Sequence, residues 1–335
     1  MARRSKIERE LEQLTALRDD PNNPQSRDRL RAALAHKSNL VVASAAHIIG
    51  EIGEAGGFSG AEIGDLSPLM TSAFDRFMTD PVKRDPQCRA KIALVRALGQ
   101  LDCDAEDAYR RALRHTQDEP GWGGESDTAG QLRALAAIAL VNGRYPDIWP
   151  PLAELLADPE PNARSGAAQA MACSGNSEIA VPLLRLRIRC GEENSQVLVT
   201  FLGALLSLSP DTEIEYVASL LSDRTSDRRE AACLALGESR LAGALAPLCT
   251  HAENCVSAAE RRIAFVAIAM LRTDDAWAHL LDRLARGSSA MAGDALSALA
   301  AYHHDKQLGQ RVLAACSQRG DDRLIAEATR TFSAR

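Results

Sequence analysis

Aromatic side chains are scarce in this chain, where they make up 4% of 335 residues. Because rings normally supply much of the buried area of a core, the core must be built from Ala, Leu, Ile and Val. Long apolar runs are also missing, since even the stretch 134–141 is far shorter than the roughly 18 residues of a membrane-spanning helix. We therefore predict no transmembrane segment.

The start of the chain lacks the apolar stretch of a secretory signal, because charged side chains crowd residues 1–17. None of the 8 cysteines forms a C-x-x-C pair, and most of them lie in apolar, helix-like contexts. We expect small buried thiols rather than disulfides or a zinc site. These absences predict a cytoplasmic protein.

Lysine is rare as well: the 39 basic residues include only Lys6, Lys37, Lys83, Lys91 and Lys306, and all the others are arginine. The 45 acidic residues outnumber them, which gives a net charge of −6. This balance argues against general binding of polyanions.

What the sequence does contain is an internal repeat of about 30 residues. Segments such as "RALAAIALVNG" (133–143), "RSGAAQAMACSG" (164–175) and "RREAACLALGES" (228–239) share one pattern. Aligned on the first small residue, the anchors are Ser44, Ala93, Ala136, Ala167, Ala231 and Ala264; a weaker copy fits with Phe201 at the anchor, and a last one fits near Ala295. Small anchors allow neighbouring helices to approach closely, which explains the abundance of alanine.

A second pattern precedes several anchors, namely a Pro-Leu pair at 68–69, 151–152, 182–183 and 247–248. Proline fits the first turn of a helix, where its missing N–H has no partner. Each unit is therefore predicted to be a helix A, a short turn and a helix B. Gly50, Gly99, Asn142 and Gly237 are predicted to end B helices as left-handed C-caps, and no strand is predicted.

A Pro-Leu helix, an Asp-containing turn and then "R-x-x-A-A-x-A-L-G" resemble HEAT repeats over about residues 38–302. The pattern is most similar to the HEAT-like repeats of phycobilin lyase subunits and bacterial scaffold proteins. The resemblance implies an all-α fold, an alpha-alpha superhelix of about eight to nine helical hairpins. We expect an N-terminal helix and linker over 1–26, with the linker at 19–26, and the solenoid over 27–335.

Arginine recurs at the start of the B helices, which line the concave face of a typical HEAT array. The candidate binding residues are Arg89, Arg133, Arg164, Arg228, Arg229, Arg261 and Arg262. An Asp precedes three of them by five or six residues, so we expect a structural ladder of Asp–Arg pairs. The alternative is an open groove of arginines that holds phosphates or acidic peptides.

A further candidate is the acidic insertion "TQDEPGWGGESDT" (116–128), in which Trp122 lies between glycines. A tryptophan on an exposed loop can contact a partner. The alternative is that its ring folds back onto the solenoid.

The chain has no recognisable catalytic, nucleotide-binding or zinc motif, and it has no His-Glu dipeptide of the kind that HEAT-like di-iron hydroxylases use. We therefore expect no enzyme activity, no metal and no cofactor. The leading hypothesis is a non-catalytic scaffold that grips a protein partner through its concave face and the Trp122 loop. The alternatives are a nucleic-acid-binding protein with an Arg-lined groove and a lyase-type subunit that resembles the phycobilin lyases.

Overall fold

The computed structural model describes residues 6–18, 23–121, 124–255 and 257–332, and it confirms the predicted all-α class. In these residues the chain forms helices that pack neighbour to neighbour, together with one short pair of strands. The structure consists of two compact units, residues 1–175 and 176–335. Among the described residues, no helix is long and apolar enough to cross a membrane.

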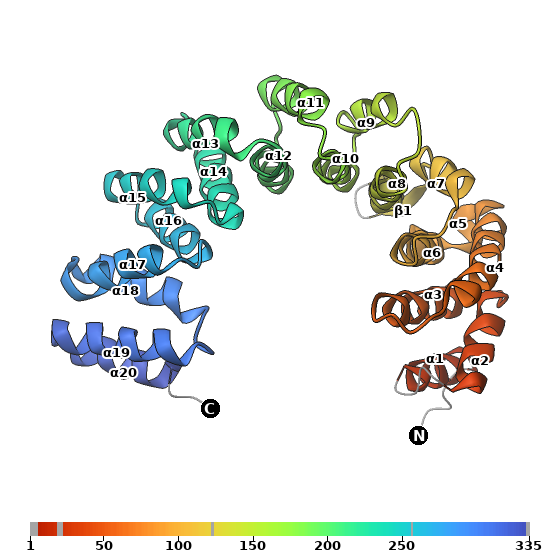
Figure 1. The fold of residues 1–335 in the computed structure, drawn as a ribbon, viewed down its shortest axis with the longest axis horizontal. Coiled ribbons are helices and arrows are strands. Elements are labelled where there is room, and N and C mark those ends of the chain that lie inside the picture. The colour runs from red at the N-terminus through yellow and green to blue at the C-terminus, as the bar shows by residue number, and fades with distance from the viewer. Residues whose placement is uncertain (1–5, 19–22, 122–123, 256, 333–335) are drawn as a thin grey trace. The chain divides into compact units, whose positions relative to one another are not determined.

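Unit 1 stacks four helical hairpins behind an N-terminal helix (Figure 1). Its helices are α1 (Lys6–Leu17), α2 (Pro24–Leu34), α3 (Asn39–Glu54), α4 (Gly60–Met78), α5 (Pro81–Arg84), α6 (Arg89–Gln100), α7 (Glu106–Leu113), α8 (Gly130–Asn142), α9 (Trp149–Leu155) and α10 (Pro161–Ser174). The B helices α3, α6, α8 and α10 pack in succession, and α2, α4, α7 and α9 are their A helices. Helix α2 begins within the predicted linker, because the Asn23 side chain caps its first turn.

Unit 2 stacks five hairpins in the same alternation. Its helices are α11 (Ser177–Cys190), α12 (Ser195–Leu208), α13 (Pro210–Ser219), α14 (Ser226–Ser239), α15 (Leu245–Asn254), α16 (Ala258–Met270), α17 (Asp274–Arg286), α18 (Ser289–Ala300), α19 (Lys306–Arg319) and α20 (Asp322–Phe332). The even-numbered helices are the B helices and pack on one another. The described residues thus contain nine hairpins, within the predicted eight to nine.

The core is built from small and aliphatic side chains, as the composition predicts. The anchors Ala136, Ala167, Ala231, Ala264 and Ala295 are all buried. Ser44 and Ala93, in contrast, are only half-buried, while their neighbours Ala45 and Leu94 are fully buried. The predicted repeat register is therefore wrong by one residue in α3 and α6.

The glycines predicted as C-caps have a different role. Gly50, Gly99 and Gly237 lie inside helices that continue for one or more further residues, and none of them has a positive φ. A Cβ on Gly237 would lie 2.6 Å from the backbone oxygen of Ala267 in α16. This glycine allows two B helices to touch backbone to backbone, which a side chain would prevent.

The Pro-Leu pairs mark helix starts less often than predicted. Pro151 lies in the first turn of α9, but Pro68 and Pro182 lie inside α4 and α11. Helix α4 begins earlier because Ser59 and Glu62 form a capping box, which satisfies the first free amides.

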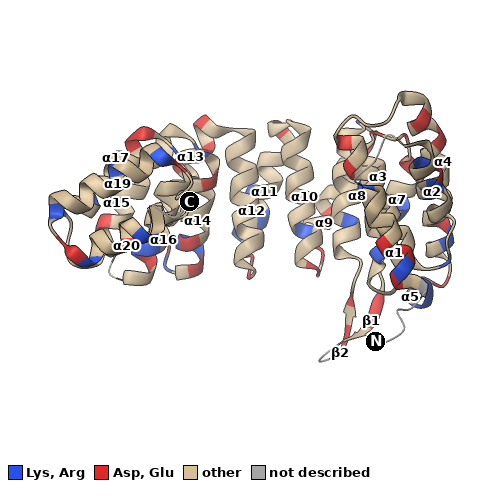
Figure 2. Ribbon diagram, turned by 90° about the horizontal axis from the view of Figure 1, so that it is seen from below, with Lys and Arg blue, Asp and Glu red and all other residues tan. Residues whose placement is uncertain are grey.

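The insertion before α8 forms a β-hairpin that the sequence did not predict. Strands β1 (Asp118–Gly121) and β2 (Gly124–Asp127) pair antiparallel, with Asp118 opposite Asp127. In unit 1 they extend past the ends of the neighbouring helices (Figure 2). Trp122 lies outside the described residues, so its partner contact stays a prediction.

Candidate functional site

The seven candidate arginines all lie within the first five residues of a B helix, and Arg133 shows the predicted ladder most clearly. Arg133 of α8 donates to both oxygens of Asp158, at 2.8 and 2.7 Å, in the turn before α10. It also donates to Asp127 at 2.7 Å and to the His115 carbonyl at 2.8 Å. The Arg133 side chain is 3% exposed, so its charge is balanced by these carboxylates inside the protein.

The ladder continues in unit 2. Arg261 donates through two nitrogens to Asp294 of α18, at 2.9 and 2.7 Å, and the exposed Arg262 reaches the other oxygen of the same carboxylate. Arg229 pairs with Glu260 of the next B helix. These contacts join successive hairpins, but neither Asp294 nor Glu260 is among the acids that the sequence spacing singled out.

Arg164 bonds to the turn before its own helix, whereas Arg228 bonds to such a turn and also to α11 of another hairpin. Arg164 donates to the Asp158 and Pro159 carbonyls at 2.8 and 2.9 Å. Arg228 donates to Asp223 at 3.3 Å and to the Ile188 carbonyl at 2.7 Å. Both guanidinium groups thus have partners in their own unit.

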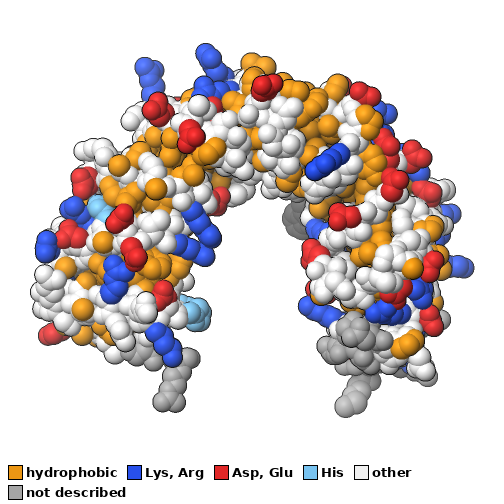
Figure 3. Space-filling model, in the orientation of Figure 1, with side chains coloured by type: hydrophobic (Ala, Val, Ile, Leu, Met, Phe, Trp, Pro, Cys, Tyr) orange, Lys and Arg blue, Asp and Glu red, His pale blue; other side chains and the backbone are white. Residues whose placement is uncertain are grey.

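Arg89 differs, because it faces a groove of about 520 Å³ over α3, α6 and α8. We call this the α3–α6–α8 groove, and the side chains that define it are Ser44, His47, Arg89, Ile92, Ala93 and Arg96. Its lining carries two arginines and a histidine, and no carboxylate. On the face of unit 1 that Figure 3 shows, hydrophobic, acidic and basic side chains are mixed together.

The two groove arginines have no acidic partner among the described residues. Arg89 donates through Nε and Nη2 to the neutral Oε1 of Gln87, at 3.2 and 2.8 Å. Arg96 makes no hydrogen bond or ion pair within the described part of the chain. The groove therefore presents uncompensated positive charge on both sides of the apolar Ile92.

Ser44 and His47 are one helical turn apart in this groove but do not form a nucleophile–base pair. Within the described residues no hydrogen bond links the Ser44 hydroxyl to the imidazole, whose Nε2 lies 3.6 Å from Glu51. The His47 side chain is 58% exposed, so water competes for both ring nitrogens. This arrangement can bind a polar group but does not activate the serine.

Behind the groove lies a fully buried polar cluster. The Asp85 carboxylate accepts from the Ala90 and Lys91 amides at 2.8 and 3.0 Å, and so caps α6. The Lys91 ammonium donates to Gln117 at 2.7 Å and lies 3.5 Å from Asp85. Asp85 and Lys91 are both 0% exposed, and such a pair is stable only because its hydrogen bonds are satisfied.

The β-hairpin completes this cluster through Glu119. Its Oε1 accepts from the Gln87 amide at 2.6 Å, from the Gln117 side chain at 2.6 Å and from the Thr128 hydroxyl at 2.8 Å. Burial alone would raise the pKa of Glu119, but these hydrogen bonds outweigh it and lower the pKa. Gln87 and Cys88 both have left-handed φ angles, 61° and 53°, which cost energy in residues with a side chain. Glu119 thus holds a strained turn at the edge of the groove.

The sequence pointed to Arg89 but missed Arg96, His47 and Lys91. The burial pattern places Lys91 at the position in α6 that Arg133 occupies in α8, and Arg89 at that of the exposed Gln131. The signal that could have found them is the register of buried positions in α6, with Leu94 rather than Ala93 as anchor. Arg96 then lies on the same helix face as Arg89.

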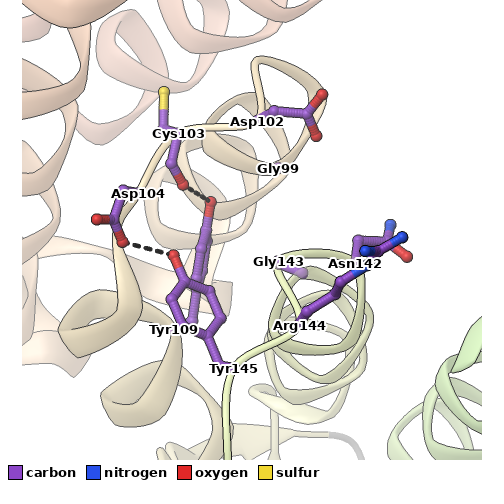
Figure 4. Close-up of a pocket in the computed structure, with 10 residues that line it drawn as sticks. Gly99, Asp102, Cys103, Asp104, Tyr109, Asn142, Gly143, Arg144 and Tyr145 are labelled. Atoms are coloured by element: carbon purple, nitrogen blue, oxygen red, sulfur yellow. Dashed lines mark hydrogen bonds between the residues drawn. The ribbon is translucent and has the colours of Figure 1, made fainter.

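A second cavity, of about 550 Å³, lies at the C-terminal ends of α6 and α8 (Figure 4). The Tyr109 hydroxyl donates to the Cys103 carbonyl at 3.2 Å, and the Tyr145 hydroxyl donates to Asp104 at 2.7 Å. Burial, followed by the bond to Asp104, raises the pKa of Tyr145 to about 12. Both phenols are therefore neutral at pH 7 and bonded to the protein, which suits a structural role.

Known proteins add little to this picture. No protein-family model matches the chain, and no curated protein matches it. The crystal structure of an engineered protein from the Northeast Structural Genomics Consortium aligns with 98% of this chain and 96% of its own, at 15% identity and a TM-score of 0.35. A second engineered protein from the same consortium aligns over 92% and 95%, at 14% identity and a TM-score of 0.22. Scores this low identify neither a family nor a function.

Metal binding has no support in the geometry either. No group of three His, Cys, Asp or Glu side chains within the described ranges is placed to hold a metal ion. The α3–α6–α8 groove is therefore the candidate site.

Proposed function

We propose that this chain is a non-catalytic adaptor of the HEAT-like type, which binds a protein partner in the α3–α6–α8 groove of unit 1. The observation that carries the proposal is the contrast between the arginines. Arg133 and Arg261 are bound to carboxylates, whereas Arg89 and Arg96 face an open groove without one. A groove that combines guanidinium groups lacking an acidic partner with apolar surface is suited to protein side chains.

The nucleic-acid alternative receives less support from the same contacts. Binding to a phosphate backbone gains strength from many cations that neutralise successive phosphates. Most of the predicted arginines instead donate to Asp, Glu or backbone carbonyls of their own unit. The lyase-type alternative stays a prediction that none of these contacts favours.

The test is capture of partners from the native cells by the tagged full chain at about 0.1 M salt. The groove-blocked variant is Ala93→Phe, which places a ring between the two arginines. The matched control is Ala61→Phe on the exposed face of α4. Bound material is read by mass spectrometry and by the ratio of absorbance that separates protein from nucleic acid.

We expect one stoichiometric protein with the wild type and with Ala61→Phe, and its loss with Ala93→Phe. Retention of that protein by Ala93→Phe would place the contact elsewhere and overturn the proposal. Nucleic acid as the main captured species, lost with Ala93→Phe, would support the alternative instead.

A further inference from the structure

We propose that the partner segment in this groove is an acidic amphipathic helix in which two carboxylates, seven residues apart, flank an apolar side chain. This inference rests on the adaptor function proposed above and names the chemistry of its partner.

The spacing of the groove residues carries the inference. Arg89 and Arg96 are seven residues apart in α6, which places their backbones on one face about 10.5 Å apart along the helix axis. Ile92 and Ala93 lie between them on that face, and all four line the groove. An approaching helix with acids at i and i+7 and an apolar residue at i+3 or i+4 has the complementary pattern.

The charge of the groove selects the sign of that partner. No Asp or Glu lines the groove, and Gln87, which holds Arg89, is neutral. Guanidinium groups bind carboxylates through paired hydrogen bonds, which adds direction to the attraction. A basic segment would meet the guanidinium groups of Arg89 and Arg96 with no carboxylate in the lining to offset them.

Arg89 is held in place before any partner arrives. Two of its nitrogens donate to the Gln87 side chain, and the backbone N–H of Gln87 donates to Glu119 of the β-hairpin. Arg89 is therefore partly ordered in the unbound protein, and less side-chain entropy is lost there when a partner binds. Arg96 has no such support, so Arg89 is expected to contribute more to binding than Arg96.

The probe is a fluorescein-labelled, alanine-based peptide of 18 residues with Glu seven residues apart and Leu at the third and fourth positions between them. Three control peptides are used: one with Gln in place of both Glu, one with the two Glu on opposite helix faces, and one with Lys in place of both Glu. Binding to the full-length protein is measured by fluorescence anisotropy at low and moderate salt.

We expect Arg89→Gln and Arg96→Gln to weaken binding by about 5-fold and about 3-fold, which correspond to exposed charge pairs of about 1 and about 0.7 kcal/mol. Arg114→Gln on the exposed end of α7, which lies outside the groove, is the matched control and should change nothing. The double variant Arg89→Glu/Arg96→Glu should lose the Glu peptide and bind the Lys peptide in its place. Circular dichroism confirms that each variant is folded.

Equal binding of the Gln peptide or of the Glu peptide with opposite faces would overturn the inference, and so would no binding of the probe at all. Its failure is distinguishable from failure of the adaptor function. If the native partner is lost with Ala93→Phe but kept by Arg89→Gln and Arg96→Gln, the adaptor stands and the acidic helix is wrong. If the partner is kept by Ala93→Phe, the adaptor proposal itself fails.

Discussion

Replacing Arg133 with Met tests whether the arginine ladder is structural. The substitution removes the guanidinium and keeps a side chain of similar length. It leaves the carboxylates of Asp127 and Asp158, which are only 11% and 12% exposed, without their main cation. It also leaves the His115 carbonyl without its donor. Because breaking one side of a buried ion pair strands the remaining charge, we expect a loss of about 3 kcal/mol in the stability of unit 1.

The assay is urea unfolding of the full-length protein, with hydrogen exchange read by mass spectrometry in peptides from α8 and from α14. The α8 peptides should lose protection in Arg133→Met, while those of α14 in the other unit should not. Arg89→Met is the control, because this exposed arginine has no acidic partner in the described structure and should cost less than about 0.5 kcal/mol. A loss in Arg133→Met no larger than in Arg89→Met would refute the structural role of the ladder.

Two further predictions use other contacts. Gly166→Ala should destabilise unit 1 by about 1–3 kcal/mol, because the new Cβ would lie 2.2 Å from the Ala134 Cβ. A Cβ on Gly203 in α12 meets nothing within 4 Å, so Gly203→Ala should stabilise its helix by about 1 kcal/mol. Equal effects of the two variants on thermal unfolding would contradict this prediction. Because the pKa of Glu119 is lowered in the folded protein, its charge adds stability above the unfolded pKa, near 4.3, and that stability is lost as the pH falls through the folded pKa. Glu119→Gln should therefore be less stable than wild type at pH 7 but equally stable in acid, and a difference in thermal unfolding that does not change with pH would contradict it.

The stacked-hairpin fold could be predicted from sequence because the constraint repeats. A hairpin of about 30 residues cannot bury its apolar face alone, so each copy of the pattern adds evidence for the same packing. The Asp–Arg ladder was predictable only in part. The spacing singled out Asp127 and Asp158, which pair with Arg133, but not Asp294 and Glu260, which lie in the following B helices. Both features depend on spacing along the chain, which the sequence displays directly.

The groove could not be predicted in the same way, because it depends on a helix register that differs by one residue. In α6 the pattern suggested Ala93 as anchor, but the structure buries Leu94. That shift moves Lys91 into the buried position and turns Arg89 towards the groove. The small residue Ala93 beside the true anchor hides the shift, since Ala fits a packed face and an open one equally well.

The β-hairpin was missed for a different reason. Strand prediction relies on alternating apolar residues, but β1 and β2 contain only acidic residues, Ser, Pro and Gly. Hydrogen bonds from two backbone amides hold the hairpin: Gln87, distant in sequence, donates to Glu119, and Gln117, at the base of the hairpin, donates to Asp127. Polar contacts of this kind leave no periodic signal.

The role of an arginine in this protein follows from whether its position in the repeat brings it within reach of an acid. Arg89 and Arg133 both lie in the first turn of a B helix, and both belong to unit 1. Arg133 is buried against two carboxylates, which makes it part of the packing between α8 and α10. Relative to the buried anchor of its helix, Arg89 lies two residues further towards the N-terminus than Arg133 does. It bonds only to the neutral side-chain amide of Gln87, so its charge remains available to a partner. The same repeat pattern can therefore supply both a ladder that joins neighbouring hairpins and a groove with unpaired positive charge, through a shift of two positions along the helix.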